Sequence, residues 1–288
     1  MHSKLFALSA CAAVCMAIFA GTAFAYAPGD VLGELPANLF ATEGDTLESM
    51  LDSTTIESQL GRAAADAVRL AAGSDIAVVN GGDLESNLRG GNVTWEQICS
   101  AFPEGRQLAV AEITPRELKS MLEAAVSRVV VDDGEHIDHD KSSNGAYPQI
   151  SGFTFTYDIS YLPGDRVRSI ELDGESLALD DGERLITLAA TEYMLSGGYD
   201  MPAEEHELLD LDLRRAFAAY VASGIPEPDN SPGNERITIH GTKDFQLFDR
   251  IPGATALVLA LIGIIVLAEL LRGERPAGRD ELRNFRTE

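Results

Sequence analysis

The segment that most limits the fold of this chain is a short apolar run, 76–79, followed at once by Asn80, Gly81 and Gly82. Apolar residues without alternation are typical of a strand that is buried on both faces of its sheet. Such a strand needs a layer packed against each face. Glycines directly after it let the backbone approach a ligand closely. The chain is therefore predicted to carry a binding loop at the edge of a layered sheet.

Helical patterns surround this strand. Apolar residues recur at helical spacing over 60–71, and Gly73 is placed to end that helix. Thr94 begins a capping-box pattern, and Thr114 supplies a second N-cap with a proline directly after it. The helix opened by Thr114 is predicted to bury one face of 118–129. Further strands are expected at 108–113, 153–157, 167–172, 185–190 and 237–239, with a last helix over 208–222. The predicted fold class is α/β (α+β), a mixed β-sheet layered with helices.

The composition excludes one class of partner. With 46 acidic against 22 basic residues, the formal net charge is -24, and the surface field repels phosphate backbones. Nucleic acid is not an expected partner. At 45% hydrophobic residues the chain can bury a full core. Of its cysteines only Cys99 lies between the two terminal segments described next, so no intramolecular disulfide is expected there, and Cys99 is predicted to be core.

The N-terminal segment has the pattern of an export signal. Lys4 precedes an apolar run, and Ala23-Phe24-Ala25 fits a cleavage site, so 1–25 is predicted to be a signal peptide. A lipoprotein-type cut before Cys11 is the alternative, but it leaves too short an apolar run. Residues 26–43 are predicted to be a leader and 44–240 the folded domain.

The C-terminal segment has the pattern of a membrane anchor. The apolar run 251–271 is about 21 residues long, enough to cross a hydrocarbon core of about 30 Å. A buried core helix is the alternative. Residues 241–250 would be a juxtamembrane linker, and the arginine-rich tail 272–288 predicts a cytoplasmic C-terminus. The expected topology is a single-pass cell-membrane protein with an extracytoplasmic body.

The order of motifs resembles the C-terminal, substrate-binding domain of the 5'-nucleotidases. The likeness extends over about 43–239. Its points are, in chain order, Glu57 and Gly61, 74–82, Val93 and Thr94, 118–126, 149–153, 163–167 and 196–198. In that family a separate N-terminal metallophosphoesterase domain performs metal-assisted hydrolysis. Nothing in this sequence resembles its histidine motifs, and only five histidines are present. The chain alone is therefore not expected to hydrolyse phosphate esters, and no cofactor is expected.

The resemblance assigns candidate binding residues position by position. Asn80 matches the asparagine that contacts the nucleoside, and Gly81 and Gly82 match the close-approach glycines. The family arginine that contacts the anionic end of the nucleotide falls on Glu85, and a second family arginine, expected upstream of the Glu57 motif, falls near Thr54. Because a carboxylate repels phosphate where a guanidinium would bind it, the anion clamp is predicted to be lost.

The family also sandwiches the base between two aromatic rings. The first ring position falls on Glu104, unless Phe102 substitutes from a shifted turn, and the second is matched by Tyr193. Gly197 and Gly198 match the late glycine pair. The acidic residue that follows this pair in the family falls on Tyr199 here, although Asp200 comes next.

Two weaker candidates lie outside these positions. The acidic loop 132–144 holds His136, Asp138, His139 and Asp140, which are types that can bind a divalent ion, but acidic loops are usually only solvated. Arg89, beside two glycines, is either a replacement anion site or a surface residue.

Three functions remain open from the sequence. The first is a non-catalytic binding module with a degenerate nucleotide site, for a nucleoside-like molecule or a protein. The second is the substrate-binding part of a nucleotide-hydrolysing assembly whose metallophosphoesterase is a separate chain. The third is a structural or adhesion surface protein that reuses the fold.

Overall fold

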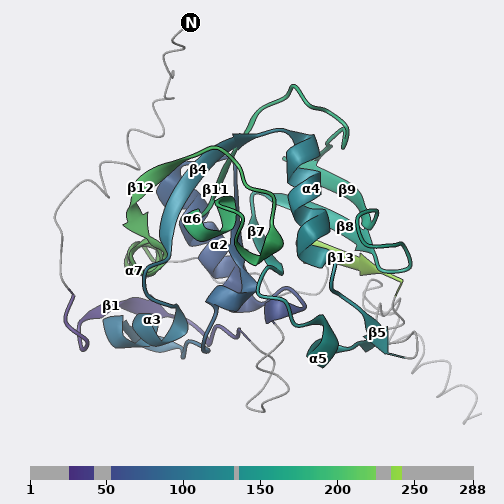
Figure 1. Ribbon diagram of the computed structural model, residues 1–288. Coiled ribbons are helices and arrows are strands. Elements are labelled where there is room, and N and C mark those ends of the chain that lie inside the picture. The colour runs from purple at the N-terminus through teal and green to yellow at the C-terminus, as the bar shows by residue number, and fades with distance from the viewer. Residues whose placement is uncertain (1–25, 42–52, 133–135, 225–234, 242–288) are drawn as a thin grey trace, which may run out of the picture. The chain divides into compact units, whose positions relative to one another are not determined.

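The computed structural model describes residues 26–41, 53–132, 136–224 and 235–241, all within one compact unit, 1–245 (Figure 1). The predicted signal peptide, membrane span and cytoplasmic tail lie outside these residues, as does all but Gly241 of the predicted linker. Within the described ranges, no helix is both long and apolar enough to cross a bilayer.

A five-stranded mixed sheet forms the centre of this unit. Its strand order is β12-β4-β11-β2-β7, in which β11 runs parallel to β2 and every other neighbouring pair is antiparallel. The strands are β2 (Ile76–Asn80), β4 (Gln107–Ile113), β7 (Pro148–Ser151), β11 (Ile186–Thr191) and β12 (His206–Asp212).

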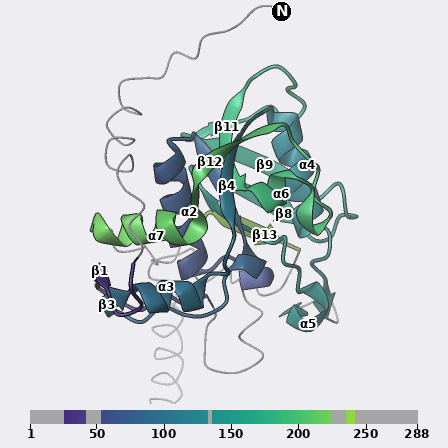
Figure 2. The same ribbon diagram turned by 60° about the vertical axis from the view of Figure 1, so that its left-hand side comes forward.

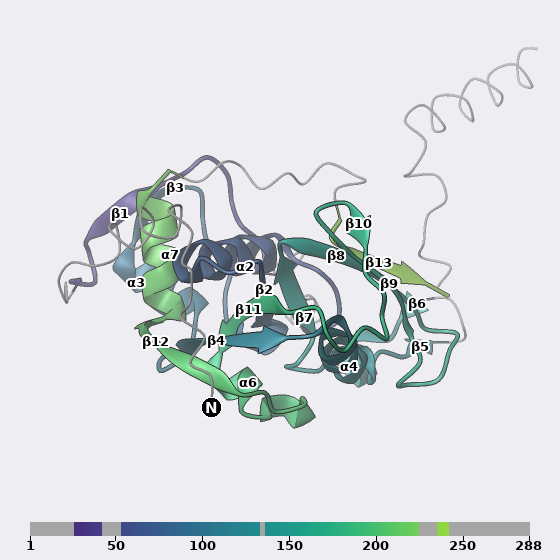
Figure 3. The same cartoon turned by 90° about the horizontal axis from the view of Figure 1, so that it is seen from above.

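Strand β2 is buried along its whole length, as its sequence predicted. Ile76 and Val78 point into one hydrophobic cluster, whereas Ala77 and Val79 point into another. The central sheet thus separates two cores. In the view from above, α2 and α7 lie on one side of it, and α4 lies on the other side together with the second sheet (Figure 3).

The second sheet has four strands in the order β10-β9-β8-β13. They are β8 (Phe153–Asp158), β9 (Val167–Leu172), β10 (Glu175–Ser176) and β13 (Ile237–His240). The β9–β10 hairpin turns at Asp173 and Gly174, both with positive φ. Arg166, at the start of this hairpin, donates to the carbonyls of Val126 (2.6 Å) and Val129 (2.7 Å). A buried guanidinium therefore satisfies carbonyls at the C-terminal end of α4.

The predicted helix caps are confirmed. Helix α2 (Gln59–Ala72) ends at Gly73 in the left-handed conformation, φ 64°. Both α3 (Trp95–Ala101) and α4 (Pro115–Val126) begin with complete capping boxes, at Thr94 and Thr114. Shorter elements are α5 (His139–Ser142), α6 (Glu192–Leu195), the 3₁₀ turns η2 (Gly81–Asp83) and η3 (Gly198–Asp200), and the small pair β5 (Val131–Asp132) and β6 (His136–Ile137).

Two predictions about elements were wrong. The expected leader contains strand β1 (Val31–Leu35), which pairs with β3 (Gly91–Thr94) (Figure 2). Leu35 in β1 and Leu39 after it are buried in the core. The last helix, α7 (Leu213–Ala222), begins at Leu213 rather than near 208, because His206–Asp212 pairs with β4 as strand β12. Strand β12 lies at the edge of the sheet and alternates leucines with acidic residues. The spacing of these leucines also fits one face of a helix, so the sequence pattern does not distinguish the two.

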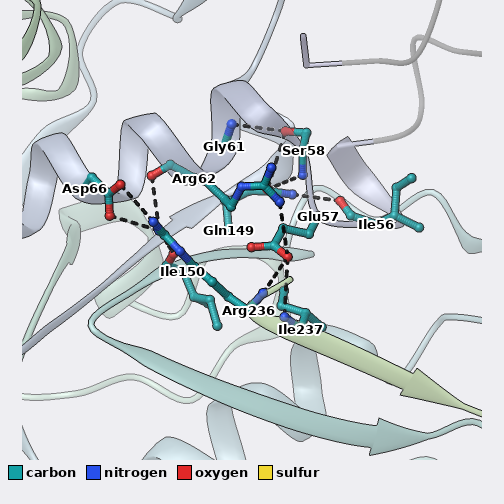
Figure 4. A network of polar contacts seen from close by, with 10 residues as sticks. All are labelled: Ile56, Glu57, Ser58, Gly61, Arg62, Asp66, Gln149, Ile150, Arg236 and Ile237. Carbon is teal, nitrogen blue, oxygen red and sulfur yellow. Dashed lines mark hydrogen bonds and ion pairs between the residues drawn. The ribbon is translucent and has the colours of Figure 1, made fainter. Parts of the chain in front are cut away.

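Glu57 and Gly61, which the resemblance singled out, have structural roles. A Cβ on Gly61 would overlap the side chain of Gln149, whose amide also accepts from the Ser58 backbone at 2.9 Å (Figure 4). Glu57 accepts the backbone N–H of Arg236 at 2.9 Å, and Arg236 holds Asp66 through two bonds of 2.9 and 2.8 Å. This network ties β13 to α2.

Candidate functional site

Four loops meet at one edge of the central sheet. Because β2 and β11 are parallel, their C-terminal ends reach the same edge, which carries η2 after β2 and α6 with η3 after β11. Strands β4 and β7 are antiparallel to these neighbours, so the segments that precede them, 102–106 and 144–147, start at that edge too. Ligands of open α/β sheets bind at this kind of edge.

The glycines of the Asn80 loop are required by close contact within the protein. Gly81 donates its N–H to the carbonyl of Tyr147 at 2.8 Å, and a Cβ there would overlap the carbonyl oxygen of Ser53. A Cβ on Gly82 would lie 2.7 Å from the Cα of Gly145. Both glycines were predicted to admit a ligand, but in this structure they admit the chain's own backbone.

Asn80 lies at the base of the site with its amide unsatisfied. Its side chain is fully buried, and neither Nδ2 nor Oδ1 has a hydrogen-bond partner among the residues that the structure describes. The amide lies beside Asp83, whose carboxyl pKa it helps to lower, but without the geometry of a hydrogen bond. Because a buried amide without a partner loses free energy, Asn80 has capacity to bind a further polar group.

Asp83 and Arg106 form an ion pair at the centre of the site. The Nε of Arg106 donates to Oδ1 of Asp83 at 2.6 Å, whereas Oδ2 of this fully buried carboxylate has no partner within the described ranges. Burial raises the pKa of Asp83 above its ordinary value, and Arg106 offsets only part of that rise. Burial acts to lower the pKa of Arg106, but Asp83 outweighs it, so the guanidinium remains charged.

Two tyrosine rings enclose this pair. Arg106 lies over the ring of Tyr193, 5.0 Å from its centroid, and Tyr199 meets that ring edge-on at 5.1 Å. Tyr193 is 39% exposed, so one face of the site is open to solvent. Tyr199 packs on Gly145, and its hydroxyl would lie 2.8 Å from a Cβ on Gly82. Gly198 is also needed here, since a Cβ there would strike Tyr193.

The structure places Asn80, Gly82, Tyr193 and Gly198 around the Asp83–Arg106 pair and Tyr199, whereas the nearest neighbours of Gly197 are Met201 and Ala203. The prediction that Phe102 lines the site is wrong. Its ring is fully buried in the core on the side of the central sheet that α2 and α7 cover. There it packs 4.8 Å from Phe217 and does not face the site. Glu104 is exposed in the turn that follows Phe102.

The positions that depart from the family pattern border the same loops. Glu85 is exposed, and its charge adds to the rise in the pKa of Asp83. Thr54 lies against Gly81, and its hydroxyl is 3.1 Å from that of Ser143. Asp200 is the remaining acid near the glycine pair, but its side chain is 87% exposed and forms an ion pair with Arg128 at 2.9 Å.

The acidic loop 132–144 is described except for residues 133–135, and its described residues form no metal site. In the described part of the chain, no group of three or more His, Cys, Asp or Glu residues is arranged to hold a metal ion. Asp138 caps α5 and pairs with Lys141, His139 lies 2.6 Å from the hydroxyl of Thr55, and His136 faces Asp132. Asp140 and Arg89 are exposed. Cys99 is a free thiol that is half-buried, so the prediction that it is core holds only in part.

Sequence reasoning missed Asp83 and Arg106. The signal for Asp83 was an acid inside a glycine loop directly after a buried strand, where no charge is expected without a partner. Its partner is 23 residues away in sequence, and no local pattern links the two.

Comparison with known proteins gives the same family as the motifs. The sequence model described as "5'-nucleotidase, C-terminal domain" matches residues 38–206, more than half of the chain. The trifunctional nucleotide phosphoesterase protein YfkN of Bacillus subtilis (strain 168) is 30% identical over 142 residues, which are 46% of this chain and 9% of that protein. The 5'-nucleotidase of Bos taurus is 29% identical over 163 residues, 51% of this chain and 26% of that protein.

A solved structure shows the same fold. The crystal structure of a 5'-nucleotidase precursor from Thermus thermophilus superposes with a TM-score of 0.59 at 21% identity, covering 80% of this chain and 41% of that one. The chain thus spans less than half the length of each of these three proteins. From the motifs, the fold and the match over 38–206 together, this chain belongs to the 5'-nucleotidase C-terminal domain family.

Proposed function

We propose that this chain is a membrane-anchored, extracytoplasmic binding module that takes a nucleoside-like molecule and rejects its phosphorylated form. The observation that carries the proposal is the unsatisfied amide of Asn80, which is buried beside Asp83 at the position where the resemblance puts the nucleoside contact. The domain 44–240 would be the binding body, with 1–25 as export signal and 251–271 as anchor.

The local charge supports the rejection of phosphate. Two family arginines are replaced by Thr54 and Glu85, and the guanidinium that the site does contain, on Arg106, is already paired with Asp83. With Asp83 and Glu85 against Arg106, the site holds an excess of one negative charge. An entering phosphate would meet repulsion and no free cation among the site residues named here.

The aromatic contacts predict that a base is bound more weakly here than in the family, because fewer rings stack on it. Tyr193 is the only one of the two expected rings that faces the site, because Phe102 belongs to the core. A base would therefore be stacked on one side only, by Tyr193.

A second candidate function is the substrate-binding part of a hydrolytic assembly. The coverage of the relatives favours it, since each contains more than twice the length that this chain matches. A separate metallophosphoesterase chain would supply the metal-activated water. Phosphate release from AMP by this chain mixed with such a protein, and by neither alone, would support this alternative.

Titration calorimetry of the purified full chain with adenosine and AMP tests the main proposal. We expect adenosine to bind and AMP to bind at least about tenfold more weakly, which corresponds to about 1.4 kcal/mol. AMP binding as tight as adenosine binding would contradict the loss of the phosphate clamp.

A further inference from the structure

The site holds more unused hydrogen-bonding capacity than Asn80 alone. Oδ2 of Asp83 and both polar atoms of Asn80 are buried without partners among the described residues, although these two side chains come from one short loop. A native structure rarely leaves such atoms unsatisfied, and a buried carboxylate oxygen is the most costly of them. Oδ2 of Asp83 and Oδ1 of Asn80 are therefore two acceptors without a donor, and Nδ2 of Asn80 is a donor group without an acceptor.

Tyr199 covers this pair. Its ring packs on Gly145 and its hydroxyl lies against Gly82, directly beside the Asn80–Asp83 loop. Asp83 is close enough that its charge, after burial, helps to raise the pKa of the Tyr199 hydroxyl. The backbone of Tyr199 is left-handed, φ 57°, and that of Asp200 is too, φ 63°. Consecutive residues other than glycine in this conformation cost free energy, so the turn is held by its contacts.

We propose that Asp83 is a specificity-determining residue, which accepts a hydrogen bond from an exocyclic amino group of the ligand once the Tyr199 ring moves aside. The inference rests on the proposed nucleoside-binding function and narrows it to amino-bearing bases. An asparagine amide pairs with the donor and acceptor edge of adenine. Oδ2 of Asp83, beside that amide, takes the second amino hydrogen, which Asn80 leaves unused.

This arrangement predicts which ligands are rejected. A base without the amino group would leave the Asp83 carboxylate buried and unsatisfied, and a site of this kind discriminates strongly against a ligand that lacks the donor. Oδ1 remains on Arg106, so the ion pair need not break on binding.

The test compares adenosine with purine riboside, which differs only by the missing amino group. Calorimetry of the full chain is expected to show adenosine bound at least about tenfold more tightly, because a hydrogen bond to a charged group is at stake. In Asp83→Asn, which keeps the shape of the side chain, that preference should fall to about threefold or less. Tyr199→Gly, which suits a left-handed backbone, should tighten adenosine binding about threefold to tenfold by removing the cover.

The outcomes separate the two proposals. If adenosine and purine riboside bind the wild-type chain equally, or Asp83→Asn keeps the full preference, the role of Asp83 is overturned while nucleoside binding stands. If Tyr199→Gly weakens adenosine binding, Tyr199 is a ligand contact and the cover is overturned. If neither nucleoside binds the wild-type chain or Tyr199→Gly, the proposed function itself fails. Thermal unfolding of each variant confirms that it is folded.

Discussion

At the scale of single residues, the binding loop is fixed by backbone contacts that only glycine permits. Gly81 lies against the carbonyl of Ser53, so Gly81→Ala must displace that segment and should lower the free energy of unfolding by about 1 to 3 kcal/mol. Gly29→Ala is the matched control, because a Cβ there meets nothing within 4 Å. Urea unfolding of both variants measures the difference, and equal stabilities would contradict the packing described for this loop.

Some residues of the site could be predicted from the sequence and others could not. Asn80, Gly82 and Tyr193 could be placed in one site because each lies in a short motif with its own local pattern. Phe102 could not be placed, because its burial depends on Phe217, which comes from α7. The Asp83–Arg106 pair was missed for the same reason, since tertiary contact and not spacing creates it.

At the scale of elements, the network around Glu57 joins β13 to α2 and predicts a pH dependence of stability. Burial raises the pKa of Glu57 above 4.5, and Arg62 and Arg236 offset only part of the rise. The folded state therefore holds this proton at a pH where the unfolded chain has released it. The contribution of Glu57 to stability is fully present below about pH 4.5 and is lost as the pH rises through the raised pKa.

Glu57→Gln removes this titration. The stability of the wild-type chain relative to the variant should fall as the pH rises above about 4.5, measured by urea unfolding at each pH. Glu175→Gln, at an exposed position on β10, is the control and should leave the pH dependence unchanged. A wild-type chain that gains stability relative to Glu57→Gln as the pH rises would reverse the sign and refute the account of this network.

Helices and strands were predicted correctly where the sequence pattern fits only one kind of secondary structure. The doubly buried β2 and the capped helices α3 and α4 were found because continuous apolar runs and capping boxes are local signals. Strand β1 was missed because its pairing with β3 joins segments about 60 residues apart. Strand β12 was taken for helix because its leucines fit both periods.

At the scale of the whole molecule, the net charge of -24 repels anions. This repulsion adds to the one proposed for Asp83 and Glu85 at the site. Salt screens exposed charges that are more than about 8 Å apart at physiological ionic strength, so the local term dominates there. The central claim is that Glu85, in place of a family arginine, helps to turn a nucleotide site into a nucleoside site.

The most direct test is the ratio of AMP to adenosine affinity in Glu85→Arg, measured by calorimetry at physiological salt. Glu175→Arg is the matched control, since it changes the net charge equally from an exposed position in the other sheet. The account predicts that Glu85→Arg strengthens AMP binding about tenfold relative to adenosine, whereas Glu175→Arg changes that ratio by less than about twofold. An unchanged ratio in Glu85→Arg, or an equal gain in both variants, would contradict it.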